Sequence, residues 1–279
     1  MLQRSADLIE FDSLASALTA PGLAGRRHKG LGYLAALVLA IGVWWLLSAL
    51  RAFPRFALPS PADVYHAFVT TTTTGYISVT LQQDLVSSLV RVGMAFGGAV
   101  AAGTLIGVLM AENRVIFGLI DPFLQFLRPI PPLAFIGLFV IWFGIGELPK
   151  DLLILVSTLP VIIINTISGV RGAPRQRVEV AQCLGATKGE ILRRVVLPSA
   201  LPEIFTGMRV GVGVAWSTLV AAELIAAQRG LGYVVWQATQ ELQTPIVFAG
   251  IIVIGIVGYL MELFVRSLEA TLVPWRGKT

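Results

Sequence analysis

Charged residues are scarce in this sequence. They make up 13% of its 279 residues, whereas a soluble domain carries about 25%. Hydrophobic residues make up 56%, and the mean hydropathy is +0.80. This composition excludes an ordinary soluble enzyme, and it excludes intrinsic disorder, which requires low hydrophobicity. We therefore predict an all-α polytopic membrane protein.

Residues that carry covalent or metal chemistry are also few. Cys183 is the only cysteine, so no internal disulfide can form and a cysteine-based zinc or redox site is excluded. The only histidines, His28 and His66, fall on opposite sides of the predicted membrane. We therefore expect no catalytic residue, no metal site and no cofactor in this chain. The net charge of +5 fits basic cytoplasmic loops and gives no reason to expect nucleic-acid binding.

Six stretches are apolar and long enough to cross the hydrocarbon, which takes about 20 helical residues. The predicted spans are 31–50, 87–111, 122–146, 151–170, 206–228 and 244–266. They form a transmembrane domain over 31–270. A cytoplasmic N-terminal tail, 1–30, precedes it, and a cytoplasmic C-terminal tail, 271–279, follows it.

The orientation follows from the lysines and arginines outside the spans, because cytoplasmic loops carry the excess of these residues. With the N-terminus inside, 15 of them fall on the cytoplasmic side and five on the outer side. Arg128, within the third span, is not counted. Both termini are therefore predicted to lie in the cytoplasm, and the longest cytoplasmic loop is 171–205.

Glycines recur at four-residue spacing inside the spans, as in Gly103 and Gly107 and in Gly207 and Gly211. Small residues at this spacing let helix backbones approach closely in lipid. We therefore expect tight helix packing at both pairs.

The cytoplasmic loop has the pattern of two short helices joined by a tight bend. Pro174 suits a helix start, where its missing N–H costs nothing. Gly185 suits the left-handed position that ends a helix. Thr187 and Glu190 have the spacing of a capping box, which begins the next helix.

The second helix of the loop is expected over 188–196. Pro198 and Pro202 are expected to break it before the next span. Two interpretations fit this helical hairpin: it rests on lipid headgroups through its basic residues, or it docks a soluble partner.

The order of residues in this loop resembles the EAA motif. Glu179 and Ala181 are followed after three residues by Gly185, and nine residues later a Val-Val-Leu-Pro segment ends at Pro198. Val180 departs from the motif, which usually has alanine there, but a hydrophobic residue suits the same helix face. The motif marks permease subunits of ATP-binding cassette (ABC) importers.

In that family the loop docks into a cleft of the ATPase subunit and transmits its movement. The resemblance implies this ATPase-coupling role for a set of residues in the loop. They are Glu179, Ala181, Leu184, Gly185, Ala186, Thr187, Glu190, Leu197 and Pro198.

Further segments are similar to the nitrate/sulfonate/taurine branch of the family. They read RPIPPLA at 128–134, IWFGIGE at 141–147, WSTLVAAELIAA at 216–227 and RGLG at 229–232. The similarity extends over about 31–275 and is greatest to the taurine permeases. It implies a type I importer permease fold, with coupling helices between spans four and five.

The resemblance also implies partners and a location. A second copy of the chain would complete the pathway, two ATPase subunits would bind ATP and Mg, and an extracytoplasmic substrate-binding protein would deliver the substrate. The site would be a bacterial inner membrane, in contact with lipid. The implied substrate is taurine, with other aliphatic sulfonates or nitrate as alternatives.

No phosphate-binding loop of the pattern G-x-x-x-x-G-K-[S/T] occurs in the sequence, and the nearest fragment, 185–189, has the wrong spacing. If ATP drives transport, another subunit hydrolyses it. We therefore predict that this chain is not an enzyme.

Five residues are candidates for the translocation pathway or a gate. Trp216, Ser217 and Thr218 lie in the middle of the fifth span and are interpreted as pathway residues. Glu223 lies near the outer end of the same span, where it either packs or snorkels between helices or forms an outer gate. Arg128 precedes a proline-rich break and either anchors at the headgroups, the interpretation we favour, or attracts an anionic sulfonate.

A different class remains as an alternative, a self-sufficient secondary transporter. Such proteins have inverted repeats and ion ligands at the midplane. The sequence shows no convincing internal repeat and no acid at a span's midplane.

Overall fold

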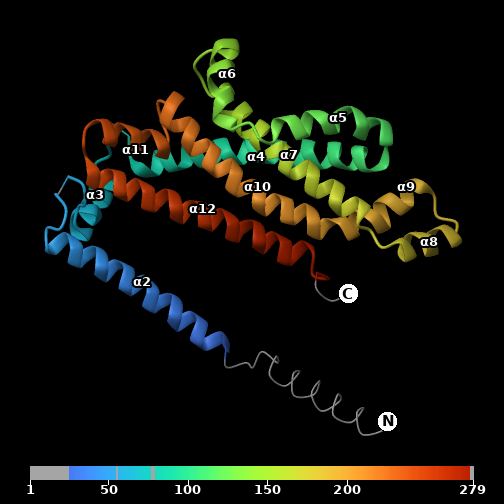
Figure 1. The fold of residues 1–279 in the computed structure, drawn as a ribbon, viewed down its shortest axis with the longest axis horizontal. Coiled ribbons are helices and arrows are strands. Elements are labelled where there is room, and N and C mark those ends of the chain that lie inside the picture. The colour runs from blue at the N-terminus through green and yellow to red at the C-terminus, as the bar shows by residue number, and fades with distance from the viewer. Residues whose placement is uncertain (1–24, 55, 77–78, 277–279) are drawn as a thin grey trace, which may run out of the picture. The chain divides into compact units, whose positions relative to one another are not determined.

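The computed structural model describes residues 25–54, 56–76 and 79–276, which are helical apart from their connections (Figure 1). No strand occurs in this part of the chain, where a single isolated bridge pairs Tyr76 with Val79. The chain divides into two compact units, one up to Pro61 and one from Ala62 onward. Residues 1–24 of the predicted N-terminal tail and 277–279 of the C-terminal tail lie outside the described residues.

Among its described residues, the first unit contains the helix α2 (Gly25–Ala49). Its apolar stretch is Ala35–Ala49, within the first predicted span, 31–50. After the helix, the chain turns at Arg51, and the Trp44 indole N–H donates a hydrogen bond of 3.0 Å to the Pro59 carbonyl.

Four helical stretches of the second unit are long and apolar enough to cross a membrane. They are α4 (Leu81–Glu112), α7 (Leu148–Arg171), the stretch Lys188–Ile225 and α12 (Thr244–Leu272). Each contains all or most of a predicted span. Shorter helices complete this unit: α3 (Pro61–Thr73), α5 (Arg114–Leu127), α6 (Ile136–Phe143), α8 (Arg175–Cys183) and α11 (Leu231–Gln240).

Helix α7 packs between α4 and α10 (Leu197–Ala226), and the three form the centre of the bundle (Figure 1). Close approach depends on the glycine pairs. A Cβ atom at Gly107 would lie 2.6 Å from Thr166 Cβ, and one at Gly207 would lie 2.6 Å from Asn165 Cβ. The expected tight packing is confirmed, because a side chain at either position would collide with α7.

The third predicted span, 122–146, is replaced by two helices that meet at an angle. α5 (Arg114–Leu127) begins earlier than predicted, because the Asn113 side chain accepts hydrogen bonds from the backbone N–H groups of its first turn. After Arg128 the chain breaks, and the 3₁₀ turn η1 (Pro132–Phe135) and α6 (Ile136–Phe143) continue in another direction.

The bend between these two halves is 96°, and the prolines at the break explain it because they cannot continue a regular helix. Counting the bent pair as one span gives up to five spans within the described residues. The count of six stays a prediction.

The prediction that Pro198 and Pro202 end the second loop helix is wrong. α9 (Lys188–Ile191), the π-helical turn η2 (Leu192–Val196) and α10 form one uninterrupted helical stretch. In η2 the Leu197 N–H bonds to the Leu192 carbonyl, five residues back. This wider turn relieves the clash of the Pro198 ring with the preceding turn, so the helix continues.

Candidate functional site

The helical hairpin, Pro174–Ile191, connects α7 to the stretch that contains α10. Its first helix is α8 (Arg175–Cys183) and its second begins with α9. α8 and α9 lie at one end of the long helices, and α11 lies at the other (Figure 1).

The bend of the hairpin has the predicted geometry. Gly185 adopts a φ of 80°, the left-handed conformation that glycine tolerates best. Its N–H donates to the Gln182 carbonyl at 2.9 Å, and the Ala186 N–H donates to the Ala181 carbonyl at 3.0 Å. These two bonds form a Schellman motif, which ends α8 and fixes the direction of the chain after it.

The next helix begins with the predicted capping box. The Thr187 N–H donates to the Glu190 carboxylate at 2.9 Å, and the Glu190 N–H donates to the Thr187 hydroxyl at 3.4 Å. The Thr187 hydroxyl also donates to the same carboxylate at 2.9 Å. Both sides of the bend are therefore held by local hydrogen bonds.

The hairpin has a packed side and an exposed side. Ala181 and Ala186 pack on the cluster around Ile191 and Val196. Two apolar side chains point away from it: Val180 is 60% exposed and Leu184, beside the bend, is 81% exposed.

The remaining coupling candidates divide between these sides. Glu179, Thr187 and Glu190 are exposed on the hairpin, whereas Leu197 and Pro198 are half-buried at the start of α10. The coupling role of these residues stays a prediction.

The three mid-span candidates lie on different faces of α10. Trp216 is buried, and its indole N–H donates a 3.0 Å hydrogen bond to the Ile254 carbonyl of α12. Thr218 is also buried. Ser217 alone of the three is exposed, with its hydroxyl donating to the Gly213 carbonyl at 2.9 Å. A pathway role for all three stays a prediction. Of the three, only Ser217 is exposed on the surface of the helix, where it could line a pathway.

Glu223 is fully buried, and neither solvent nor a snorkelling path reaches it. Its carboxylate forms an ion pair with Arg91 of α4 and accepts a 2.7 Å hydrogen bond from the Ser88 hydroxyl. It also accepts a 2.9 Å hydrogen bond from the Gly232 N–H at the start of α11. This single carboxylate therefore joins α4, α10 and α11.

Arg91 extends the ion pair toward α7. It also bonds to Glu147, which caps α7, and Lys150 donates to the same carboxylate at 2.7 Å. Partial burial raises the pKa of Glu147, but the hydrogen bonds from Lys150 and Arg91 outweigh it and hold the pKa below its usual range. We call the whole set the buried polar cluster; its members are Asp84, Ser88, Arg91, Glu147, Lys150 and Glu223. Glu147 lies at its edge, with 62% of its side chain exposed.

The buried polar cluster holds the turn between α10 and α11. Asp84 accepts a 2.9 Å hydrogen bond from the Gly230 N–H, and Ser88 accepts one of 3.1 Å from the Leu231 N–H. Gly230 has a φ of 125°, and a Cβ atom there would collide with the Glu223 carboxylate. Glycine is therefore required at this turn.

Sequence reasoning missed most of this cluster. It counted Arg91 and Lys150 among the five cations of the outer side, whereas the structure buries both within helices. A charge near the end of an apolar helix, as at Arg91, was the available signal.

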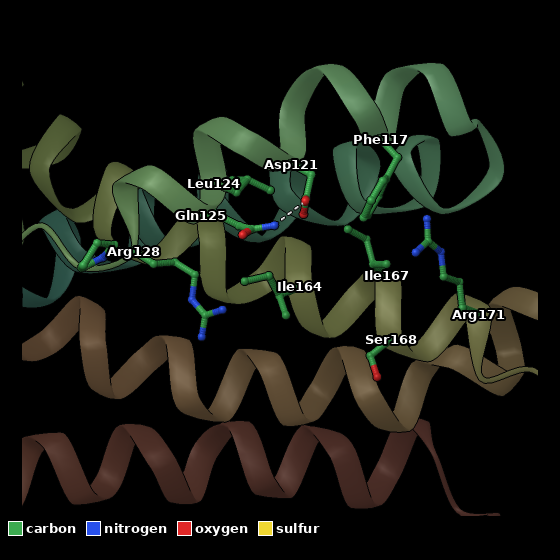
Figure 2. Close-up of a pocket in the computed structure, with 10 residues that line it drawn as sticks. Phe117, Asp121, Leu124, Gln125, Arg128, Ile164, Ile167, Ser168 and Arg171 are labelled. Carbon is green, nitrogen blue, oxygen red and sulfur yellow. Dashed lines mark hydrogen bonds between the residues drawn. The ribbon is translucent and has the colours of Figure 1, made fainter.

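Arg128 caps the C-terminal end of α5 and lines a cavity of about 790 Å³ between α5 and α7. Figure 2 shows Asp121, Gln125 and Arg128 on the same side of α5, with Ser168 and Arg171 contributed by α7. Arg128 is exposed to this cavity and has no hydrogen bond or ion pair through its side chain to any other described residue.

Comparison with known proteins identifies the family. The model of the family described as "Binding-protein-dependent transport system inner membrane component" matches residues 103–273. The taurine transport system permease protein TauC of Escherichia coli (strain K12) is 43% identical over 243 residues, 87% of this chain and 88% of TauC. The bicarbonate transport system permease protein CmpB of Synechococcus elongatus is 36% identical over 185 residues, 66% of each chain.

Solved structures agree on the fold. The inward-facing MetNI methionine ABC transporter matches with a TM-score of 0.55 at 18% identity, covering 67% of this chain and 95% of the other. An amino acid ABC transporter with histidines matches with a TM-score of 0.54 at 16% identity, covering 76% and 95%. The predicted type I importer permease fold is confirmed.

Long apolar helices joined by an exposed helical hairpin indicate a multi-span membrane protein. The chain belongs to the family of inner-membrane components of binding-protein-dependent transport systems. The resemblance to ABC importer permeases is thereby confirmed, and the family membership weighs against a secondary transporter.

Proposed function

We propose that the chain is the permease subunit of an ABC importer that carries taurine inward across a bacterial inner membrane. The supporting observation is the 43% identity to TauC over nearly the whole of both chains. CmpB, named for bicarbonate transport, is similar at 36% over a shorter region. Other aliphatic sulfonates or nitrate stay as the alternative substrates within the same class.

In this proposal two copies of the chain form the pathway, and both termini lie in the cytoplasm. Two partner ATPase subunits bind ATP and Mg, and each docks on the exposed side of a helical hairpin. Leu184 and Val180 present apolar surface there, which a partner's cleft can bury. A substrate-binding protein delivers taurine at the opposite end, near α11.

The structure offers a mechanical link between these two ends. The uninterrupted stretch Lys188–Ile225 has 38 residues, so it extends about 57 Å from the hairpin to the buried polar cluster. Since Gly185 and Thr187 fix the bend locally, a push on the hairpin moves this helix rather than bending the loop. The movement then reaches the turn at Gly230, which Asp84 holds against α4.

A growth experiment tests the proposed substrate. The gene is deleted, and growth is measured with taurine, an alkanesulfonate or sulfate as the single sulfur source. We expect growth to fail on taurine and to continue on sulfate, with rescue by the wild-type gene. Failure on the alkanesulfonate alone would keep the class and change the substrate, and normal growth on all three would contradict a role in sulfonate uptake.

A further inference from the structure

One face of α5 is polar, although the helix is apolar elsewhere. Asp121, Gln125 and Arg128 follow one another at spacings of four and three residues, so they share one face of the helix. On other faces, Phe123 and Phe126 are each 69% exposed. In a membrane, ionisable residues face a protein interior or a water-filled cavity, so this stripe identifies the wet side of α5.

The stripe faces the cavity of about 790 Å³ between α5 and α7. This volume is ample for a small organic molecule. The cavity ends at the 96° break that follows Arg128. Broken helices at membrane depth are tolerated where they are buried or line a cavity, which agrees with a wet cavity at this place.

The charged side chains that line the cavity differ in the contacts they make. Arg171 lies over the Phe117 ring, with its guanidinium carbon 4.2 Å from the ring centre. Asp121 accepts one hydrogen bond, of 2.6 Å from Gln125, and a carboxylate can accept several more. Arg128 has no side-chain partner among residues 25–54, 56–76 and 79–276. One cation and one carboxylate are therefore available to a ligand.

The two groups lie along one face of the helix. Asp121 and Arg128 are seven residues apart, which is about two turns of α5. Because both side chains line the same cavity, a short ligand with a charge at each end can meet a carboxylate and a guanidinium together.

We propose that this cavity is a transient binding site for a small zwitterion, with Arg128 binding its sulfonate and Asp121 its ammonium. The planar guanidinium suits an oxyanion group, to which it can donate two parallel hydrogen bonds. Gln125 positions the Asp121 carboxylate through its hydrogen bond. The inference rests on the proposed function, because the importer must carry a zwitterionic sulfonate for the site to act.

Ligand binding to the permease itself gives the first test. The complete permease–ATPase complex is placed in lipid nanodiscs without binding protein, and saturation-transfer NMR detects weak binding of taurine, ethanesulfonate or ethylamine. We expect taurine to bind best to the wild type. Asp121→Asn should reduce taurine binding about tenfold, to the level of ethanesulfonate, because it removes only the ammonium partner.

Arg128→Gln should abolish the binding of both sulfonates, whereas Arg128→Lys should retain part of it. The matched control is Arg114→Gln, an exposed arginine at the start of the same helix, which should bind as the wild type does. Equal taurine binding by Asp121→Asn, Arg128→Gln and wild type would overturn the site. ATP hydrolysis by each complex verifies that the variant has assembled.

Uptake by proteoliposomes with ATPase and binding protein separates this proposal from the proposed function. If the wild type takes up neither taurine nor any other sulfonate, the proposed function fails. If the wild type takes up taurine and the Asp121 and Arg128 variants do so at its rate, the function stands and the site is wrong. A loss of about tenfold or more in both variants, with the Arg114 control unchanged, supports the site.

Discussion

Arg91 of α4 and Glu223 of α10 form an ion pair in which the arginine side chain is 5% exposed and the glutamate is not exposed. The two residues are far apart in the sequence, and each has further partners in the buried polar cluster. Removing one partner of a buried ion pair leaves a charge without compensation, which costs about 3–5 kcal/mol. The pair therefore fixes how α10 sits against α4.

Replacing Arg91 should destabilise the protein strongly. For Arg91→Met we expect the melting temperature in detergent to fall by roughly 10 °C, because the Glu223 carboxylate loses its cation. The double variant Arg91→Met with Glu223→Leu should be more stable than the single variant, since the buried Glu223 charge is removed together with its partner. The control is Arg266→Ala, whose exposed pair with Glu262 contributes less than about 1 kcal/mol. A melting temperature equally low in the double variant would contradict the electrostatic explanation.

Replacing Gly185 should uncouple ATP hydrolysis from transport. A side chain at a φ of 80° costs about 1–2 kcal/mol in the left-handed conformation, so Gly185→Val should loosen the bend. Uptake by the reconstituted importer should fall severalfold more than ATP hydrolysis does. Gly189→Ala is the matched control, because it lies in α9 at an ordinary φ with open space around it. Equal uptake by the two variants would show that the bend has no part in coupling.

A charge at the tip of the hairpin should prevent docking of the ATPase. Leu184→Asp places a carboxylate where 81% of an apolar side chain is exposed, so it should abolish co-purification of the ATPase without changing the melting temperature of the permease. Gln182→Asp, on an exposed position of the same helix, is the control. If the hairpin instead rests on lipid, Leu184→Asp will assemble with the ATPase as the wild type does.

Acid should weaken the contribution of Glu147 to the stability of the folded protein. Its pKa in the folded protein lies below the usual value of 4.5, so the ionised form stabilises the fold above that pH. This stabilisation is lost as the pH falls from 4.5 through the lower folded pKa. The difference in melting temperature between wild type and Glu147→Gln should therefore be constant from pH 7 to pH 5 and shrink below it. A difference in melting temperature that grows on acidification would mean that folding raises the pKa of Glu147, which would contradict this prediction.

The features that the sequence predicted well depend on local rules. The left-handed Gly185 and the capping box of Thr187 and Glu190 involve residues within one turn of each other, so spacing alone reveals them. Long apolar runs likewise predict long helices, and α4, α7 and α12 appear where the runs do.

The features that the sequence did not predict depend on distant or concealed partners. Arg91, Glu147 and Glu223 come from three segments, and no pattern within any of them indicates the other two. The π-turn that lets the helix pass Pro198 has no signature in the residues. The prolines after Arg128 indicated a break within 122–146, but nothing in the sequence indicated that the two halves would meet at 96°.

Taurine uptake by the purified importer in proteoliposomes tests the central claim most directly. The permease, its ATPase and the binding protein are reconstituted together, and labelled taurine is followed with and without ATP. We predict accumulation that requires ATP and the binding protein and is lost with Leu184→Asp. Uptake by the permease alone, or ATP-driven uptake that persists when the hairpin cannot dock, would contradict the claim that this chain is a permease coupled through its hairpin to a separate ATPase.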